Sequence, residues 1–129
     1  MMKTLCAAII LTLALISPAA AQKSDAWRPR PIEDGCTIMV VGTTGADWAM
    51  RWDQTCEPGE PIEGAGTLHI STSDQRAVSL EARFDAGVPH GFATMRRYDP
   101  NGELLSEDVQ IYNMGCAIDD ASCRPYQPD

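Results

Sequence analysis

The sequence predicts an all-β fold, an antiparallel β-hairpin meander that forms one twisted sheet and is held by disulfides. Runs of alternating apolar and polar residues recur along the chain, with Gly, Pro and Asp turn signals about every 12 to 15 residues. No segment keeps helical apolar spacing for more than about two turns. Four of the five cysteines follow residue 21, and an even number of cysteines in a small exported domain indicates two disulfides.

Residues 1–21 have the plan of a secretory signal peptide. Lys3 supplies a positive start, an apolar run over residues 5–16 follows, and Ala19-Ala20-Ala21 supplies the small residues of a cleavage site. The apolar run is shorter than the ~20 residues of a membrane span, so we expect no stable membrane anchor. The mature chain would begin at Gln22 and be periplasmic or secreted.

The chain is acidic, with ten Lys and Arg residues against eighteen Asp and Glu residues and a net charge of −8. Only Lys3 among these charges lies in the predicted signal peptide, so the mature chain would carry −9. An acidic surface disfavours nucleic acids and anionic membranes. We therefore expect a protein partner, with a cationic one favoured by charge.

The mature chain is predicted to form one domain in three parts. Residues 22–35 form an extended N-terminal arm, because Pro29 and Pro31 deny it regular hydrogen bonding, although Trp27 is able to dock on the domain. Residues 36–115 form the β-meander repeat domain. Residues 116–129 form an irregular tail closed by a disulfide.

The first predicted hairpin joins residues 36–41, which are β-branched and apolar, to residues 48–56, which alternate apolar and polar side chains. Pairing these strands about Ala46 sets Cys36 opposite Cys56 on the buried face. The four cysteines allow three pairings, and this register favours Cys36–Cys56. Cys116 and Cys123 would then close a short loop in the tail.

Four further strands are predicted over residues 64–72, 78–85, 92–98 and 104–112, with a clear turn at Asp99-Pro100-Asn101-Gly102. Alternation assigns Trp52, Leu80 and Phe84 to the core face of the sheet. The opposite face would carry a mixed set of charged and polar residues, namely Arg51, Asp53, His69, Glu81, Arg83 and Arg96.

A repeat of 28 residues links Gly59, Gly87 and Gly115, each preceded three residues earlier by Cys56, Phe84 or Tyr112. With Trp52, Gly64-Ala65-Gly66-Thr67-Leu68, His90-Gly91 and Asn101-Gly102, this pattern resembles a divergent bacterial MORN repeat. The resemblance implies an elongated, twisted sheet that serves as a scaffold or binding surface without catalysis of its own. Independently of the resemblance, glycine at each turn would supply a positive φ or a close approach.

The sequence indicates no catalytic residues, no metal site and no cofactor. His69 and His90 lie apart from any companion nucleophile or ligand set. Glu57, Glu60 and Glu63 lack the alternating spacing of a calcium loop. We therefore expect a protein that is not an enzyme.

Two functions fit these observations. The first is a non-catalytic interaction or scaffold module of the periplasm or cell envelope. The alternative is an inhibitor or immunity-type protein that binds a cationic exported enzyme, which the small, acidic, disulfide-held chain would suit. Exposed aromatic residues make the best anchors for a partner, and the candidates are Trp48, Phe92 and Tyr98.

Overall fold

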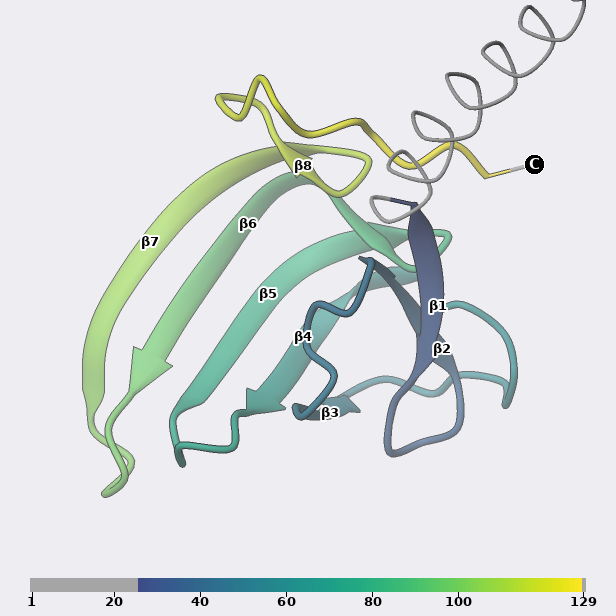
Figure 1. Ribbon diagram of the computed structural model, residues 1–129. Helices are drawn as coiled ribbons and strands as arrows, with labels where there is room; N and C mark the ends of the chain where they lie inside the picture. Colours follow the sequence, from purple (N-terminus) through teal and green to yellow (C-terminus); the bar gives the residue numbers. More distant parts are fainter. Residues whose placement is uncertain (1–25, 129) are drawn as a thin grey trace, which may run out of the picture.

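The computed structural model describes residues 26–128, and the predicted signal peptide lies outside them. Within these residues the protein has eight strands and no helix, so the all-β, antiparallel prediction is confirmed (Figure 1). No helix long and apolar enough to cross a membrane occurs there. The strands are β1 (Trp27–Pro31), β2 (Thr37–Val41), β3 (Ala49–Trp52), β4 (Gly64–Ser71), β5 (Ala77–Asp85), β6 (Val88–Tyr98), β7 (Leu104–Asn113) and β8 (Cys116–Ala117).

Strands β3 to β8 form a six-stranded meander in which every strand pairs with its neighbour in the chain. The sheet curves from β3 to β7 (Figure 1). Bulges interrupt β5–β6 at Ala82/Arg83 and β6–β7 at Arg97/Tyr98. Such bulges bend the strands and increase their twist, which suits a sheet that wraps around its core.

The predicted N-terminal arm contributes a strand, because β1 pairs with β2 from Trp27↔Val41 to Pro31↔Thr37. The expectation that the prolines would prevent regular hydrogen bonding here is wrong. Gly42 donates its N–H to the carbonyl of Ala26, and bonding positions alternate along an antiparallel strand. Pro29 and Pro31 therefore fall at positions where no N–H is needed, the setting in which an edge strand tolerates proline.

The prediction of a single sheet also needs correction, because β2 does not pair with β3. The outer edge of β2 instead bonds to loops of the larger sheet: Thr37 donates to the Glu60 carbonyl, and Met39 donates to the Gly87 carbonyl. The Cys36–Cys56 disulfide is present as predicted. It joins the two-stranded ribbon to the segment after β3, so the pairing was right and the hairpin used to argue for it was wrong.

The core lies between the β1–β2 ribbon and one face of the larger sheet, which we call the core face. Ile38 and Val40 of the ribbon are buried with residues of β3 to β5. The rings of Trp52 and Phe84 meet edge to face, with centroids 5.1 Å apart. Gly66 lies against this pair, since a Cβ there would come within 2.7 Å of the Trp52 ring. The predicted core facing of Trp52, Leu80 and Phe84 is confirmed.

The repeated glycines Gly59, Gly87 and Gly115 all have positive φ, at +84°, +88° and +91°, as expected. Gly115 also allows a close approach, because a Cβ there would lie 2.6 Å from Trp27 Cη2. Trp27 donates its indole N–H to the Arg124 carbonyl at 2.8 Å and packs edge to face on Tyr126. The first described strand is thus fastened to the last segment of the chain.

The tail predicted over residues 116–129 begins with a short strand, β8, rather than with irregular structure. The Cys116–Cys123 disulfide then closes the loop that follows. Both disulfide predictions are therefore confirmed, and two disulfides are compatible with an oxidising compartment.

Candidate binding surface

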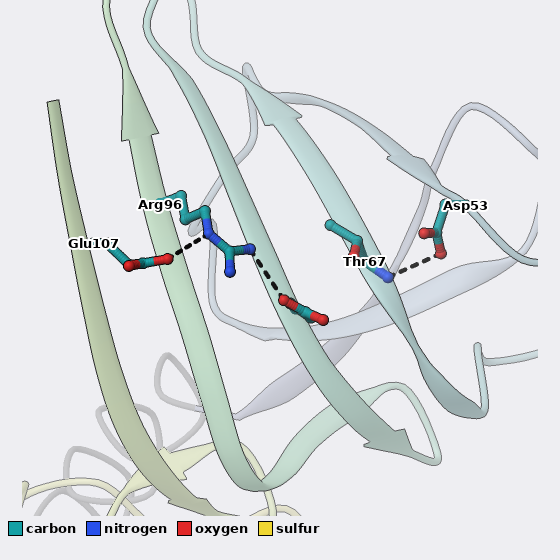
Figure 2. Close-up of polar contacts among 5 residues, drawn as sticks. Asp53, Thr67, Arg96 and Glu107 are labelled. Atoms are coloured by element: carbon teal, nitrogen blue, oxygen red, sulfur yellow. Dashed lines mark hydrogen bonds and ion pairs between the residues drawn. The ribbon is translucent and has the colours of Figure 1, made fainter. Parts of the chain in front are cut away.

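The face of the six-stranded sheet opposite the core, which we call the outer face, carries an ion-pair network on its central strands. Arg96 of β6 pairs with Glu107 of β7 at 2.6 Å and with Glu81 of β5 at 3.0 Å. Figure 2 shows the guanidinium of Arg96 facing the Glu107 carboxylate. The hydrogen bonds that Arg96 donates, first to Glu107 and then to Glu81, raise the pKa of Arg96. The network is open to solvent, so it links charged side chains of three strands and adds little stability.

Asp53 organises the other end of the same face. Its carboxylate accepts the N–H of Thr67 at 2.8 Å, and its own N–H bonds to the Thr67 carbonyl (Figure 2). The hydrogen bond from Thr67 is the main reason that the pKa of Asp53 lies below its usual value. These two bonds continue the β3–β4 ladder past Trp52.

An apolar patch adjoins these charges where β6, β7 and the segment after β8 meet. Phe92 pairs with Ile111 across β6–β7, and Ile118 donates its N–H to the Ile111 carbonyl at 3.0 Å. A hollow of about 280 Å³ is lined by Val109, Ile111 and Ile118. The patch consists of Phe92, Val109, Ile111 and Ile118, which are 73%, 65%, 38% and 64% exposed.

The patch is exposed because Phe92, Val109 and Ile111 point to the outer face, whereas the ribbon covers the core face of the sheet near β3 to β5 (Figure 1). Residues of β5 alternate between buried and exposed from Leu80 to Asp85. Residues of β7 are exposed or half-buried along its whole length. Single exposed apolar residues are ordinary, but several grouped on one surface are typical of an interaction site.

The structure does not bring the three predicted anchors together. Trp48 precedes β3, packs on the Gly45 turn and is 36% exposed. Tyr98, at the end of β6, lies in the same cross-strand row as Ala49, the residue that follows Trp48. Trp48 and Tyr98 therefore lie roughly three strand spacings, or about 14 Å, apart. Phe92 lies roughly 20 Å from Tyr98 along the same strand. Of the three, only Phe92 belongs to the apolar patch.

Tyr98 lines a different hollow, of about 670 Å³, at the end of the sheet that holds the β4–β5 and β6–β7 turns. Arg76 and Arg97 also line it. Arg76 pairs with Asp74 at 3.2 Å. The hollow is wide and is formed by the ends of β5, β6 and β7 together with turn residues such as Thr72 and Pro100, so its walls offer little pre-organised chemistry.

The two histidines have separate settings. His69 lies on the outer face, paired with Arg51 across β3–β4, as predicted. His90 accepts the N–H of Met114 on its Nδ1 at 3.0 Å. Met114 has a positive φ of 45°, so this bond holds a strained turn between β7 and β8. His90 has a structural role that the sequence did not indicate.

One group of potential metal ligands occurs within residues 26–128, formed by Asp34, Cys36 and Cys56. The two cysteines are joined in a disulfide and therefore present no thiolate. The Asp34 carboxylate accepts the N–H of Trp52 at 3.3 Å. These residues fasten the loop to β3 and have no donor set suited to a metal.

Sequence reasoning missed Val109, Ile111 and Ile118 as surface residues. The alternation of Leu105, Val109 and Ile111 with polar residues was a usable signal, because it predicts one apolar face on β7. It does not tell whether that face is buried. That depends on where the ribbon and the tail lie, which only the tertiary structure defines.

The fold and this surface define a small, disulfide-bonded, all-β protein with an exposed apolar patch beside the last long strand of its sheet. No family model matches the chain, and comparisons with curated proteins and with solved structures found no match. The resemblance to MORN repeats therefore stays a prediction.

Proposed function

We propose that this protein is a non-catalytic, exported interaction module of the periplasm or cell envelope, and that it binds a protein partner through the apolar patch. The grouping of Phe92, Val109, Ile111 and Ile118 on one exposed surface is the observation that carries the proposal. Flanking charges such as Arg96 and Glu107 would form the polar rim of such an interface.

Two features support export. The signal-peptide pattern of residues 1–21 directs a chain out of the cytoplasm. The two disulfides require an oxidising compartment to persist.

The settings of the histidines support a non-catalytic role. The Nδ1 atom of His90 is occupied by the Met114 N–H, and His69 lies among the charged residues of the open outer face. General acid–base chemistry needs a positioned partner and a site that excludes water. Neither histidine has such a site within the described residues.

The alternative function, inhibition of a cationic exported enzyme, is favoured by the net charge of −8. The two functions differ in what the partner is. A single basic enzyme that binds in a one-to-one complex and loses activity would favour inhibition. A structural protein of the envelope would favour a scaffold.

The test compares partner capture by the mature chain and its variants from envelope extract of the producing cell. The double variant Phe92→Ser with Ile118→Ser should lose at least tenfold of the captured partner, because it removes two anchors of the patch. Trp48→Ala is the matched control, since it truncates an aromatic roughly half as exposed, which lies outside the patch. Circular dichroism would show that all variants fold.

Retention of the partner by the double variant, with loss in Trp48→Ala, would move the binding surface to the opposite edge of the sheet. Retention by both would contradict binding through exposed aromatic and apolar anchors altogether.

A further inference from the structure

Strand β7 has a free backbone edge over most of its length. Strand β8 pairs with β7 only at Tyr112 and Asn113, and the Ile111 carbonyl then accepts the Ile118 N–H. Backbone groups point to alternate sides along an antiparallel strand, so Glu107 and Val109 direct their N–H and C=O groups to the same side as Ile111. Within residues 26–128 these groups have no backbone partner.

The side chains beside this edge alternate in the way that a strand-binding site requires. Leu105, Glu107, Val109 and Ile111 lie on one face and Ser106, Asp108 and Gln110 on the other. The hollow between Val109 and Ile118 adjoins the edge and could receive one apolar side chain of an added strand. Backbone bonds would supply affinity in such a complex, and the hollow would supply specificity.

The charge beside the edge is negative. Asp108 precedes Val109 in β7, and its side chain lies on the face opposite that of Val109. Asp119 lines the hollow beside Val109. Neither carboxylate has an ion-pair partner within the described residues. Glu107, in contrast, is paired with Arg96, which it shares with Glu81. An occupant with cations opposite Asp108 would therefore complement the edge.

From the free edge, the hollow and this charge, we infer that β7 adds a strand from a basic, extended segment of a partner protein. This inference rests on the proposed function and names how that partner binds. The segment carries apolar residues opposite Leu105 and Val109, on the face of the apolar patch. It carries Lys or Arg opposite Asp108, and it continues the sheet beyond β7.

A second copy of the chain fits this edge less well. If two β7 strands paired about a twofold axis at residue 107 or at residue 108, Glu107 or Asp108 of one copy would lie directly opposite the same residue of the other copy. Like charges directly opposite destabilise a strand pair. Each copy also carries a net charge of −8.

The variant that tests strand addition is Val109→Pro. Proline keeps the apolar bulk of valine but removes the N–H, and this N–H has no partner on the β6 side because Val109 faces the free edge. Val109→Thr is the matched control, since threonine keeps the N–H and the shape of valine. Thermal unfolding would show that both variants retain the fold.

The probe is the synthetic peptide acetyl-Thr-Val-Lys-Lys-Thr-Val-Thr-amide, titrated by calorimetry into the mature, disulfide-bonded chain. In antiparallel addition its two valines lie opposite Val109 and Leu105 and its first lysine opposite Asp108. Val109→Pro should weaken binding at least tenfold, and Val109→Thr less than threefold. Asp108→Asn should weaken it severalfold at low salt and less at 0.15 M salt.

Peptide variants provide an independent measurement. N-methylation of the second lysine, whose N–H would face β7, should abolish binding. N-methylation of the first lysine, whose N–H would face away, should change it less than threefold. A peptide with glutamate in place of both lysines should not bind.

The inference is overturned if the wild-type chain does not bind the basic peptide, or binds the acidic one equally. It is also overturned if the two N-methylated peptides bind with equal affinity. A wild-type dimer in sedimentation that Val109→Pro dissociates would likewise overturn it, because a second copy would then occupy the edge. If Val109→Pro keeps the envelope partner while Phe92→Ser with Ile118→Ser loses it, strand addition fails and the proposed function stands. If Val109→Pro and the Phe92→Ser, Ile118→Ser double variant both retain the envelope partner, the proposed function itself fails.

Discussion

The two ends of the six-stranded sheet use similar residues for different purposes. Near β3 to β5, alternate apolar residues such as Trp52 and Phe84 lie under the β1–β2 ribbon and form the core. At β7, alternate apolar residues such as Val109 and Ile111 point to the outer face and remain exposed. The same alternating pattern therefore stabilises the fold at one end and leaves an accessible surface at the other.

The difference follows from the face to which these residues point, because the ribbon covers only the core face, where β7 presents Asp108, Gln110 and Tyr112. The ribbon has only two short strands and is fixed to the β3–β5 end by the Cys36–Cys56 disulfide and by bonds from Thr37 and Met39 to neighbouring loops. The tail reaches the top of β7 at Tyr112 and continues away from it. A chain of this size does not supply a further layer to cover the outer face as well.

The largest expected contrast lies between Trp52→Ala and Phe92→Ala. Trp52 is 3% exposed and Phe92 is 73% exposed. Removing the Trp52 ring should lower the free energy of unfolding by about 3–5 kcal/mol, as is usual for a buried aromatic. Phe92→Ala should change it by no more than about 0.5 kcal/mol. Urea unfolding of both variants measures the contrast, and equal losses would mean that the β7 end is also packed.

The next contrast is between the two disulfides. Cys36–Cys56 spans 20 residues and Cys116–Cys123 spans 7. In the chain-entropy model their removal costs about 3 and about 2 kcal/mol. Replacement of both cysteines by alanine should add a packing loss at either site, because Cys36 and Cys116 are both buried, so the order set by loop length should hold. Urea unfolding would test this order, and a larger loss at Cys116–Cys123 would show that the tail anchors the fold.

A smaller contrast separates two glycines with positive φ. Gly102 has φ +87° and open space around it, so Gly102→Ala should cost about 1–2 kcal/mol from the backbone alone. Gly115→Ala has the same backbone cost, but its Cβ would lie 2.6 Å from Trp27. Displacing Trp27 would also break its bond to the Arg124 carbonyl, adding about 1 kcal/mol or more.

The difference between these two glycine variants can be read from thermal unfolding. Trp27→Leu is the control, because it should reduce the extra cost of Gly115→Ala and leave Gly102→Ala unchanged. Equal costs in both glycine variants would mean that the N-terminal strand does not depend on the tail.

Sequence reasoning predicted β2 to β7 because alternation and turn residues are local signals, but it began β6 at residue 92 instead of Val88 and did not predict β8. It also found both disulfides and the face to which Trp52, Leu80 and Phe84 point. It failed for β1, because prolines usually argue against a strand. They are tolerated here because the hydrogen bonds to β2 fall at the positions that alternate with Pro29 and Pro31. It failed for the apolar patch because alternation does not tell which face of β7 the distant ribbon covers.

The smallest effect lies at the boundary between the two ends, at Tyr112. This residue is half-buried against the core, while its neighbours along β7 are exposed. Burial, and then the negative charge of Asp119, raise the pKa of Tyr112 above its usual value. Titration of the phenol absorbance should therefore show a tyrosine that ionises above the usual pKa of the side chain.

The direction of the linked effect on stability follows from that raised pKa. The fold favours the neutral phenol, so the contribution of Tyr112 is fully present below the unfolded-state pKa of about 10 and is lost as pH rises through the folded-state pKa. Asp119→Asn should lower the pKa of Tyr112 slightly, because burial is the larger cause and remains. Tyr112→Phe identifies the signal. If the late-titrating phenol persists in that variant, the shift belongs to another tyrosine and the covered end of the sheet does not reach β7.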